Sequence, residues 1–478
     1  MGVGVLLLLQ LLLLLLLLPP GATAASLQDG VAWAWGLEDA LGQPPADGPP
    51  VEVGALDNAV ARVAAGADHS VVLRASGAVH TFGRGARGQL GHGDRAARST
   101  PSRVASSLLG SNIAHVAAGT HFTTVVKLTG RRAADGGAGS IAWQLYSWGT
   151  NDWGQLGIGT HSSASYDAPR SVSSLTSAAL AGTGAPGDVA SLTSGAKHTV
   201  AVLRDGRAFG WGSNRFGALG RSCYSPQTAN VAGCAVVRPE LLSVGAATVL
   251  RGAALGGDHS LLLDQAGKLW AAGRNLEGQL GLGDTVDRFA FATVPVPGRP
   301  QILQVAAGAL HSLAVGGNGQ IWAWGTNQYG ELALGSTSSG ETSPTAVAVH
   351  TVQASTVEAT AIALAAWALL FGAFAADSAA IGAMRIAAGD GFSLFAVDGG
   401  HTVIGVGRSE GGQLGASCSY PVLMSLNPRI SRCPPSVLSG GWQTEANSCV
   451  DLSAECGARK DTGECAISAR NFGYVRKL

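Results

Sequence analysis

The stretch WGTNDWGQLG, from Trp148 to Gly157, decides how the rest of the chain is interpreted. A glycine-rich loop of this kind serves either as a phosphate-binding loop or as a tight turn that the fold requires. The same spacing returns at four later places: WGSNRFGALG at Trp211, AGRNLEGQLG at Ala272, WGTNQYGELA at Trp324 and VGRSEGGQLG at Val406. Self-similarity of this kind indicates one supersecondary unit used repeatedly, so the loop is predicted to be part of the architecture.

An earlier copy of the loop, FGRGARGQLG at Phe82, contains the pattern G-x-G-x-x-G through Gly83, Gly85 and Gly88. A dinucleotide site needs more than this pattern, because it also requires a βαβ unit and an acidic residue about 20 positions further on. Since the copy is in register with the others, we interpret its glycines as structural and expect no cofactor.

A second motif precedes each loop and places a histidine three residues after a glycine. It occurs as Gly66 with His69 in VAAGADHSVVL, and again as Gly195 with His198, Gly256 with His259 and Gly308 with His311. In these four copies the histidine precedes the first glycine of the loop by 14 residues, as from 69 to 83. Two apolar runs separated by a turn fill the interval, which is the pattern of a β-hairpin.

A proline follows each loop after a variable segment, at Pro101, Pro169, Pro239, Pro295, Pro344 and Pro421. Proline cannot donate to a β-ladder, so a strand that carries it belongs at the edge of a sheet. A small antiparallel sheet repeated seven times, about every 51 residues, predicts an all-β, seven-bladed β-propeller. A half repeat at Trp33 and another at Gly440 are expected to pair and close the ring.

These motifs also carry a resemblance to a known family. The order Gly-x-x-His-Ser and then Trp-Gly-x-Asn-x-x-Gly-Gln-Leu-Gly, between roughly Trp33 and Ala446, resembles the regulator of chromosome condensation repeat family. The resemblance implies a β-propeller, and it implies guanine-nucleotide exchange on a small GTPase as the best-known activity of the family. No exchange residue can be matched in this sequence. A bacterial β-lactamase inhibitor of this fold is a precedent for a propeller that acts by binding another protein.

The repeated side chains are predicted to build the blades rather than to react. Phenylalanine replaces the histidine at Phe122 and Phe392, and a phenyl ring cannot bind a metal or transfer a proton. The recurring tryptophans share one strand position, which is typical of a blade core. The structural repeat positions are Gly66, His69, Trp148, Gly149, Gly195, His198, Trp211, Gly256, His259, Gly308, His311, Trp324 and Gly389.

The charge balance argues against a nucleic-acid partner, since 31 basic side chains match 31 acidic ones and 13% of the residues are charged. No nucleophile elbow, metalloprotease motif or P-loop occurs, so neither enzyme activity nor a metal or cofactor is expected. The one basic concentration includes Arg84, Arg87 and Arg95. Two interpretations stay open for it, a solvated rim and a contact for a partner protein.

Residues 1–24 contain a long apolar run and end on Ala22-Thr23-Ala24, which is typical of a secretory signal peptide. An uncleaved membrane anchor is the alternative, because the first residues lack Lys and Arg. Seven cysteines agree with an oxidising compartment. Cys223 and Cys234 are predicted to form a disulfide bond, and residues 447–478 to form a cysteine-containing tail.

The propeller is predicted over residues 25–446, with inserts near 130–142, 161–187, 221–248 and 336–383. Insertions in repeat proteins map to loops that often bind partners. The last insert contains 18 uncharged residues from Ala359 to Ala376. Three interpretations stay open for this segment: a helix packed on the propeller, a sequence error, and a membrane span.

These observations predict a secreted or luminal, monomeric scaffold that binds a partner protein through the loops of the propeller. Membrane contact would come only from Ala359 to Ala376 or from an uncleaved N-terminus. Nucleotide exchange on a small GTPase is the alternative function, and it rests on the family resemblance.

Overall fold

The computed structural model describes residues 33–36, 46–52, 60–130, 142–176, 188–222, 234–245, 248–317, 320–334, 342–348, 385–390, 392–397, 402–407, 422–425, 431–432, 437–438 and 441–442. The regular elements in this part of the chain are β-strands. No helix in it is long and apolar enough to cross a membrane. Ala359 to Ala376 lies outside it, so the three interpretations of that segment stay open.

Most strands belong to sets of four. The first strands are β3 (Val60–Ala65), β7 (Ile113–Ala118), β11 (Val189–Ser194), β15 (Leu250–Leu255), β19 (Ile302–Ala307) and β23 (Arg385–Ala388). The second strands are β4 (His69–Arg74), β8 (Phe122–Leu128), β12 (His198–Leu203), β16 (His259–Asp264), β20 (His311–Gly316) and β24 (Phe392–Val397). The third strands are β5 (Val79–Gly83), β9 (Trp143–Asn151), β13 (Ala208–Ser213), β17 (Leu269–Gly273), β21 (Ile321–Thr326) and β25 (Thr402–Gly407). The fourth strands are β6 (Arg98–Arg103), β10 (Ser162–Thr176), β14 (Ala235–Leu241), β18 (Arg288–Thr293), β22 (Thr342–Ala348) and β26 (Val422–Ser425).

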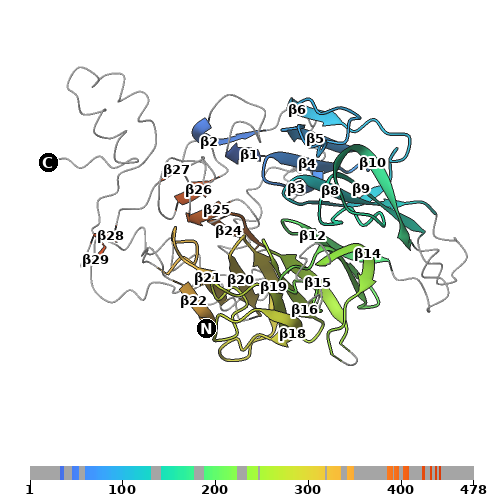
Figure 1. The fold of residues 1–478 in the computed structure, drawn as a ribbon. Helices are drawn as coiled ribbons and strands as arrows, with labels where there is room; N and C mark the ends of the chain where they lie inside the picture. Colours follow the sequence, from blue (N-terminus) through green and yellow to red (C-terminus); the bar gives the residue numbers. More distant parts are fainter. Residues whose placement is uncertain are drawn as a thin grey trace, which may run out of the picture.

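Each set forms one antiparallel sheet, in which every strand pairs with the next strand of the chain. The sheets follow one another around the molecule in chain order (Figure 1). The first strands of successive sheets contact each other, from β3 against β7 to β19 against β23. These strands therefore lie nearest a common axis, and the sheets are the blades of a β-propeller.

The described strands form six blades, where the repeats predict seven. Within this part of the chain β1 (Trp33–Gly36) pairs with β2 (Ala46–Glu52), and β28 (Val437–Leu438) pairs with β29 (Gly441–Trp442). The expected joint between the two half repeats is absent from the described strands, because each half makes its ladder hydrogen bonds within itself. A further strand, β27 (Ser431–Arg432), pairs with β26 and makes the sixth blade five-stranded.

The hairpin between the second and third strands explains the constant spacing of the two motifs. The position three residues after the first motif's glycine pairs directly with the loop glycine: His69 with Gly83, His198 with Gly212, His259 with Gly273 and His311 with Gly325. Phe122 pairs in the same way with Gly149, although 27 residues separate the two positions. The extra residues of that repeat therefore lengthen the β8–β9 hairpin without changing its register at this end.

Four of the six predicted prolines lie in fourth strands at the blade edges, whereas Pro295 lies two residues beyond the end of β18 and Pro421 lies outside the described residues. Pro101 lies in β6, Pro169 in β10, Pro239 in β14 and Pro344 in β22, and each of these strands is the last of its sheet. Three of the four expected inserts consequently contain a blade strand, namely β10, β14 and β22. Much of each insert lies outside the described residues, so the insert boundaries stay predictions.

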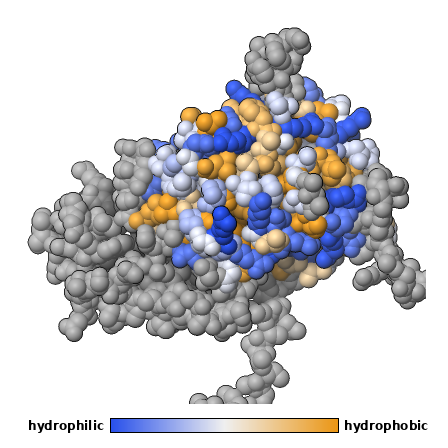
Figure 2. Space-filling model, turned by 90° about the horizontal axis from the view of Figure 1, so that it is seen from below, coloured by the Kyte–Doolittle hydropathy of each residue, from blue (hydrophilic) through white to orange (hydrophobic). Residues whose placement is uncertain are grey.

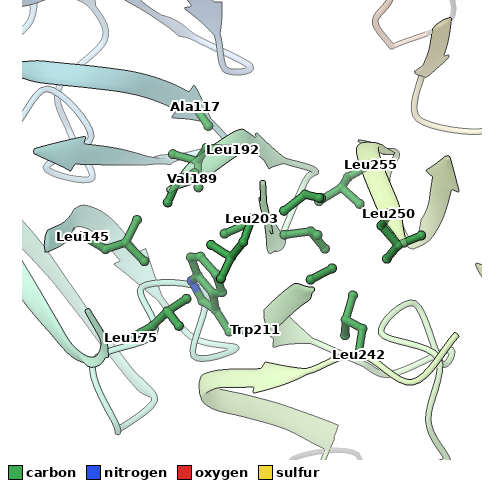
Figure 3. Close-up of a cluster of buried hydrophobic side chains, with 14 of the residues drawn as sticks. Ala117, Leu145, Leu175, Val189, Leu192, Leu203, Trp211, Leu242, Leu250 and Leu255 are labelled. Carbon is green, nitrogen blue, oxygen red and sulfur yellow. The ribbon is translucent and has the colours of Figure 1, made fainter. Parts of the chain in front are cut away.

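Large side chains fill the space between neighbouring blades. Trp148, Trp211 and Trp324 are fully buried, at 0% exposure. Figure 3 shows Trp211 of the third blade beside Leu145 and Leu175 of the second blade, within one continuous hydrophobic cluster. Burial of a tryptophan at the same place in several blades makes each blade depend on its neighbour for its core.

Gly256 shows why the first motif needs glycine. A Cβ atom at this position would lie 2.1 Å from Cε1 of His259 and 2.5 Å from the backbone oxygen of Gly308 in the next blade. Gly149, in the second motif, has a φ of 107° and would place a Cβ atom 2.3 Å from the backbone oxygen of His121. The glycines are thus required by close backbone approach, which answers the question raised by the glycine-rich loop.

We expect Gly256→Ala to lower the free energy of unfolding by about 1 to 3 kcal/mol, since overpacking forces the backbone to move. Gly252→Ala, in the strand β15 that directly precedes Gly256, is the control, because no atom lies within 4 Å of its added Cβ. Urea denaturation of both variants measures the difference. Equal stability of the two variants would contradict the packing argument.

Candidate protein-interaction face

Four histidines of the first motif hydrogen-bond to a hydroxyl group in the next blade. Nε2 lies 2.9 to 3.0 Å from the hydroxyl oxygen in each pair: His69 with Thr123, His198 with Ser260, His259 with Ser312, and His311 with Ser393. These side chains are buried at 0 to 1% exposure. The histidines therefore join one blade to the following one.

The same hydroxyl group continues the connection to a loop carbonyl. Ser312 Oγ donates to the backbone oxygen of Gln279 at 2.8 Å, and Nε1 of Trp324 donates to that oxygen at 2.8 Å. Because the hydroxyl hydrogen of Ser312 is used in this way, Nε2 of His259 must be the donor of their mutual bond. Nδ1 of His259 then carries no proton, and it has no hydrogen-bond partner among the described residues.

Burial keeps these histidines neutral. Desolvation lowers the pKa of His69, His198 and His311 to about 4 and that of His259 to about 3. A fully buried imidazole that is neutral at pH 7 has no route to a substrate. The described residues contain no group of three or more His, Cys, Asp or Glu side chains arranged to hold a metal ion.

Phenylalanine occupies the histidine site in two blades. The Phe122 ring fills the space beside Gly119, where a Cβ atom would lie 1.9 Å from it. The hydroxyl group of Thr199, which follows in the next blade, then bonds to Ser194 at 3.0 Å within its own sheet. Packing is thus kept when the hydrogen bond between blades is lost.

The loop of the second motif is held by its own side chains. In the second blade the buried Asn151 accepts a hydrogen bond from the backbone N–H of Leu156 at 3.2 Å, and Gln155 accepts one from the N–H of Trp153 at 2.8 Å. Equivalent bonds fix the other described loops. Each loop therefore presents its outermost residues in the same geometry.

Two positions of this framework differ from blade to blade. One is the tip residue, two places after the loop asparagine or its equivalent: Arg87, Trp153, Phe216, Glu277 and Tyr329. The other is the rim residue, directly before the histidine or phenylalanine: Asp68, His121, Lys197, Asp258 and Leu310. Backbone bonds hold loop and rim together, as from the N–H of Arg274 to the oxygen of Asp258 at 2.9 Å. We call the tip and rim residues together the interaction face.

Contacts on the interaction face connect neighbouring blades. Asp68 of the first blade lies 3.2 Å from Nδ1 of His121 in the second blade, and it accepts a hydrogen bond from Gln89 at 2.9 Å. Nζ of Lys197 in the third blade lies 5.7 Å from the ring centre of Trp153. The face carries acidic, basic and aromatic groups in an order that no blade repeats, and such groups suit recognition of a protein surface.

A cleft opens at the loops of the third and fourth blades, with a volume of about 670 Å³. Its lining joins the tip residue Phe216 to further residues of these loops and of the β17–β18 segment: Arg215, Arg274, Leu276, Thr285, Val286, Asp287 and Phe289. Elsewhere on the described surface, hydrophobic and hydrophilic side chains are interspersed on the face seen in Figure 2.

The basic residues singled out in the sequence lie at two places. Arg84 and Arg87 follow β5 in the loop of the first blade, and Arg87 is a tip residue of the interaction face. Arg95 instead reaches the second blade, where Nη2 lies 3.4 Å from the backbone oxygen of Ser165. Cys234 is buried at the start of β14, whereas Cys223 lies outside the described residues, so their pairing stays a prediction.

Sequence reasoning missed the cleft. Its residues stand at positions where the repeats differ from one another, so the repeat pattern does not identify them. The signal was present in the sequence, because Phe216 and Leu276 are apolar residues in otherwise polar loop tips.

Comparison with known proteins gives a consistent result. A family model described as RCC1-like domain matches residues 20–366. The chain is 30% identical over 284 residues to the ultraviolet-B receptor UVR8 of Arabidopsis thaliana, covering 59% of this chain and 57% of that protein. It is 34% identical over 145 residues to the X-linked retinitis pigmentosa GTPase regulator of Canis lupus familiaris, covering 30% of this chain and 14% of that protein. The chain thus spans little more than half of the first relative and a small part of the second.

A solved structure agrees in fold. The crystal structure of human WBSCR16 matches with a TM-score of 0.62 at 18% sequence identity, covering 83% of this chain and 95% of that chain. At this identity the likeness concerns the fold alone.

The buried histidines predict a loss of stability in mild acid. Their pKa is about 6.5 in the unfolded chain and about 3 to 4 in the folded one, so below pH 6.5 the unfolded state binds more protons. The stability is complete above pH 6.5 and falls as the pH drops toward 4. His259 alone accounts for about 2 kcal/mol of this loss at pH 5.

We expect His259→Phe to fold, as Phe122 and Phe392 do at equivalent positions, and to lose about 2 kcal/mol less than the native chain between pH 7 and pH 5. His161→Phe, at an exposed position, is the control and leaves the acid loss unchanged. Urea denaturation at both pH values measures this. An acid loss in His259→Phe as large as in the native chain would refute the buried, neutral state of His259.

Proposed function

The chain belongs to the RCC1-like domain family, and from this premise we propose that it is a secreted or luminal scaffold that binds a partner protein through its interaction face. Within the propeller, the conserved geometry of the loops displays side chains and the variable tip and rim residues select the partner. The same proposal includes a seventh blade, completed by the N- and C-terminal half repeats, and a monomeric state.

One observation carries this proposal. The repeated side chains make hydrogen bonds between blades, as in the series of bonds from His259 through Ser312 to the Gln279 carbonyl. The side chains of the tip and rim residues do not take part in those hydrogen bonds. The tip residue differs in each described loop, and no two described blades share the same pair of tip and rim residues. Variation concentrated on loops of a rigid scaffold is the usual arrangement of a binding surface.

The compartment rests on the sequence. Residues 1–24 have the pattern of a secretory signal peptide. Cys234 is predicted to pair with Cys223, and a disulfide bond of this kind agrees with an oxidising environment. Membrane attachment by an uncleaved N-terminus is the alternative within the same proposal.

Guanine-nucleotide exchange on a small GTPase is the second candidate function. The name of one relative, the X-linked retinitis pigmentosa GTPase regulator, favours it. The match covers 14% of that protein, and a GTPase outside the secretory pathway would not meet a luminal chain. We therefore rank it below the scaffold.

We expect Trp153→Ser and Phe216→Ser together to weaken capture of a partner from the secretory fraction by at least tenfold, about 1.4 kcal/mol. Both side chains are half-buried tip residues, and their loss removes apolar contact area while the interblade bonds remain. Leu241→Ser, at a 61% exposed position on β14, is the control and leaves capture unchanged. Equal capture by all three proteins would place binding elsewhere.

The exchange candidate has its own measurement. Purified chain is added in catalytic amounts to a panel of small GTPases loaded with a fluorescent guanine nucleotide. The scaffold proposal expects no acceleration of nucleotide release. Acceleration, together with a cytosolic location of the tagged chain, would replace the scaffold by an exchange factor.

A further inference from the structure

The cleft between the third and fourth blades has an unusually apolar wall for a surface loop. Leu276 is 60% exposed, Val286 is 61% exposed and Phe289 is 40% exposed. They are three of the seven large hydrophobic side chains that are exposed in the described part of the chain. Gathering exposed apolar groups in one concave place costs solubility unless a partner covers them.

Two arginines contact the ring of Phe216, which lines this cleft. Cζ of Arg215 lies 5.2 Å from the centre of the Phe216 ring, and Cζ of Arg274, from the next blade, lies 5.6 Å from it. A guanidinium over an aromatic face keeps its in-plane N–H donors, which match the two oxygens of a carboxylate. Both guanidinium groups carry a positive charge next to the same ring, so this part of the cleft favours an anionic group.

The apolar wall is held in place before any partner arrives. The N–H of Val286 donates to Asp284 at 3.0 Å, and Asp287 accepts a hydrogen bond from the N–H of Asn275 at 2.7 Å. Asp284 and Arg288 form an ion pair across the same turn. A surface that is already ordered loses little entropy on binding.

The fold does not require these side chains. The position of Arg274 is Arg84, Thr150, Ser213 or Thr326 in the other described loops. The position of Phe216 is Arg87, Trp153, Glu277 or Tyr329. Val286 corresponds to Ala96 in the first blade, where the N–H donates to Asp94 in the same way. All of these blades fold, so the combination in the cleft serves something other than folding.

We propose that this cleft binds an extended segment of the partner protein in which an Asp or Glu side chain stands close to a large aliphatic or aromatic one. The carboxylate pairs with the guanidinium groups of Arg215 and Arg274, and the apolar side chain packs on Leu276, Val286 and Phe289. The assignment rests on the scaffold function proposed above and names the chemistry that the scaffold recognises.

The lining disfavours a polyanion. The carboxylate of Asp287 belongs to the cleft, and the apolar wall has nothing to offer a phosphate backbone. The chain as a whole has a formal net charge of +0 at pH 7, so no long-range field attracts a nucleic acid. A peptide that combines one or two carboxylates with apolar groups complements both the arginines and the apolar side chains of the cleft.

The test selects peptides from a displayed random library on the purified full chain, with counter-selection on Arg274→Glu. We expect the enriched peptides to carry Asp or Glu within a few residues of Leu, Ile, Val, Met or Phe. A synthetic copy of an enriched peptide should bind at least tenfold more weakly to Arg274→Glu and to Val286→Asp, and more weakly at high salt. Replacing the Asp or Glu of the peptide by Asn or Gln should also weaken its binding to the native chain by at least tenfold.

Matched substitutions in the first blade serve as controls. Arg84→Glu stands at the position of Arg274, and Ala96→Asp stands at the position of Val286. Neither should change the affinity of the peptide, and thermal melting of all four variants verifies that they are folded. Val286 is exposed, so Val286→Asp reports on the cleft even if Arg274→Glu unfolds.

The outcomes separate this inference from the proposed function. Enrichment of neutral or basic peptides, or binding that the cleft variants leave unchanged, overturns the inference. If partner capture still depends on Trp153 and Phe216 in that case, the scaffold stands and the cleft is not its acidic-peptide site. Loss of peptide binding in Arg84→Glu alone would move the site to the basic loop of the first blade.

Discussion

One backbone carbonyl in each Gln-Leu-Gly loop is the point through which neighbouring blades are joined. The Gln279 oxygen accepts hydrogen bonds from the Ser312 hydroxyl and the Trp324 indole of the next blade, and His259 completes the chain from its own blade. Every member is buried, so an unmet bond would carry the full cost of desolvation. The carbonyl of Gln89 plays the same part between the first two blades, which makes a blade stable only beside its neighbour.

A belt of backbone hydrogen bonds near the axis imposes the second constraint. It runs from blade to blade through Ala67 to Thr120, Thr120 to Ala196, Ala196 to Gly256, Gly257 to Ala309 and Ala309 to Gly389, at 3.0 to 3.2 Å. The glycine of the first motif lies beside this belt, and a Cβ atom at Gly66, Gly195, Gly256 or Gly308 would lie 2.4 to 2.5 Å from a backbone oxygen of the next blade. These glycines are therefore required by the packing of blades around the axis and not by a ligand.

The sequence predicts what depends on local pairing. The 14 residues from His69 to Gly83 are a hairpin register, and Pro101 or Pro239 marks an edge strand because proline cannot donate. Other features depend on residues that are distant in the chain. The serine-rich β10 has no alternating apolar pattern, so its pairing with β9 is not evident from its own residues. The cleft likewise depends on residues that are distant in the chain, because Phe216 and Arg274 meet only when two loops of different blades come together.

The two constraints explain how one fold can present a specific surface. Interblade bonds use the buried carbonyls, hydroxyls and imidazoles, and they leave the tip and rim residues free to differ without loss of stability. Because Asn, Gln or Glu side chains bond to the backbone of each described loop, a change at a tip residue alters chemistry and not shape. The first two blades consequently present the Asp68–His121 pair while the third and fourth present two arginines around Phe216. A partner that recognises both must bind in one orientation, so the repeated framework itself converts unlike loops into directional recognition.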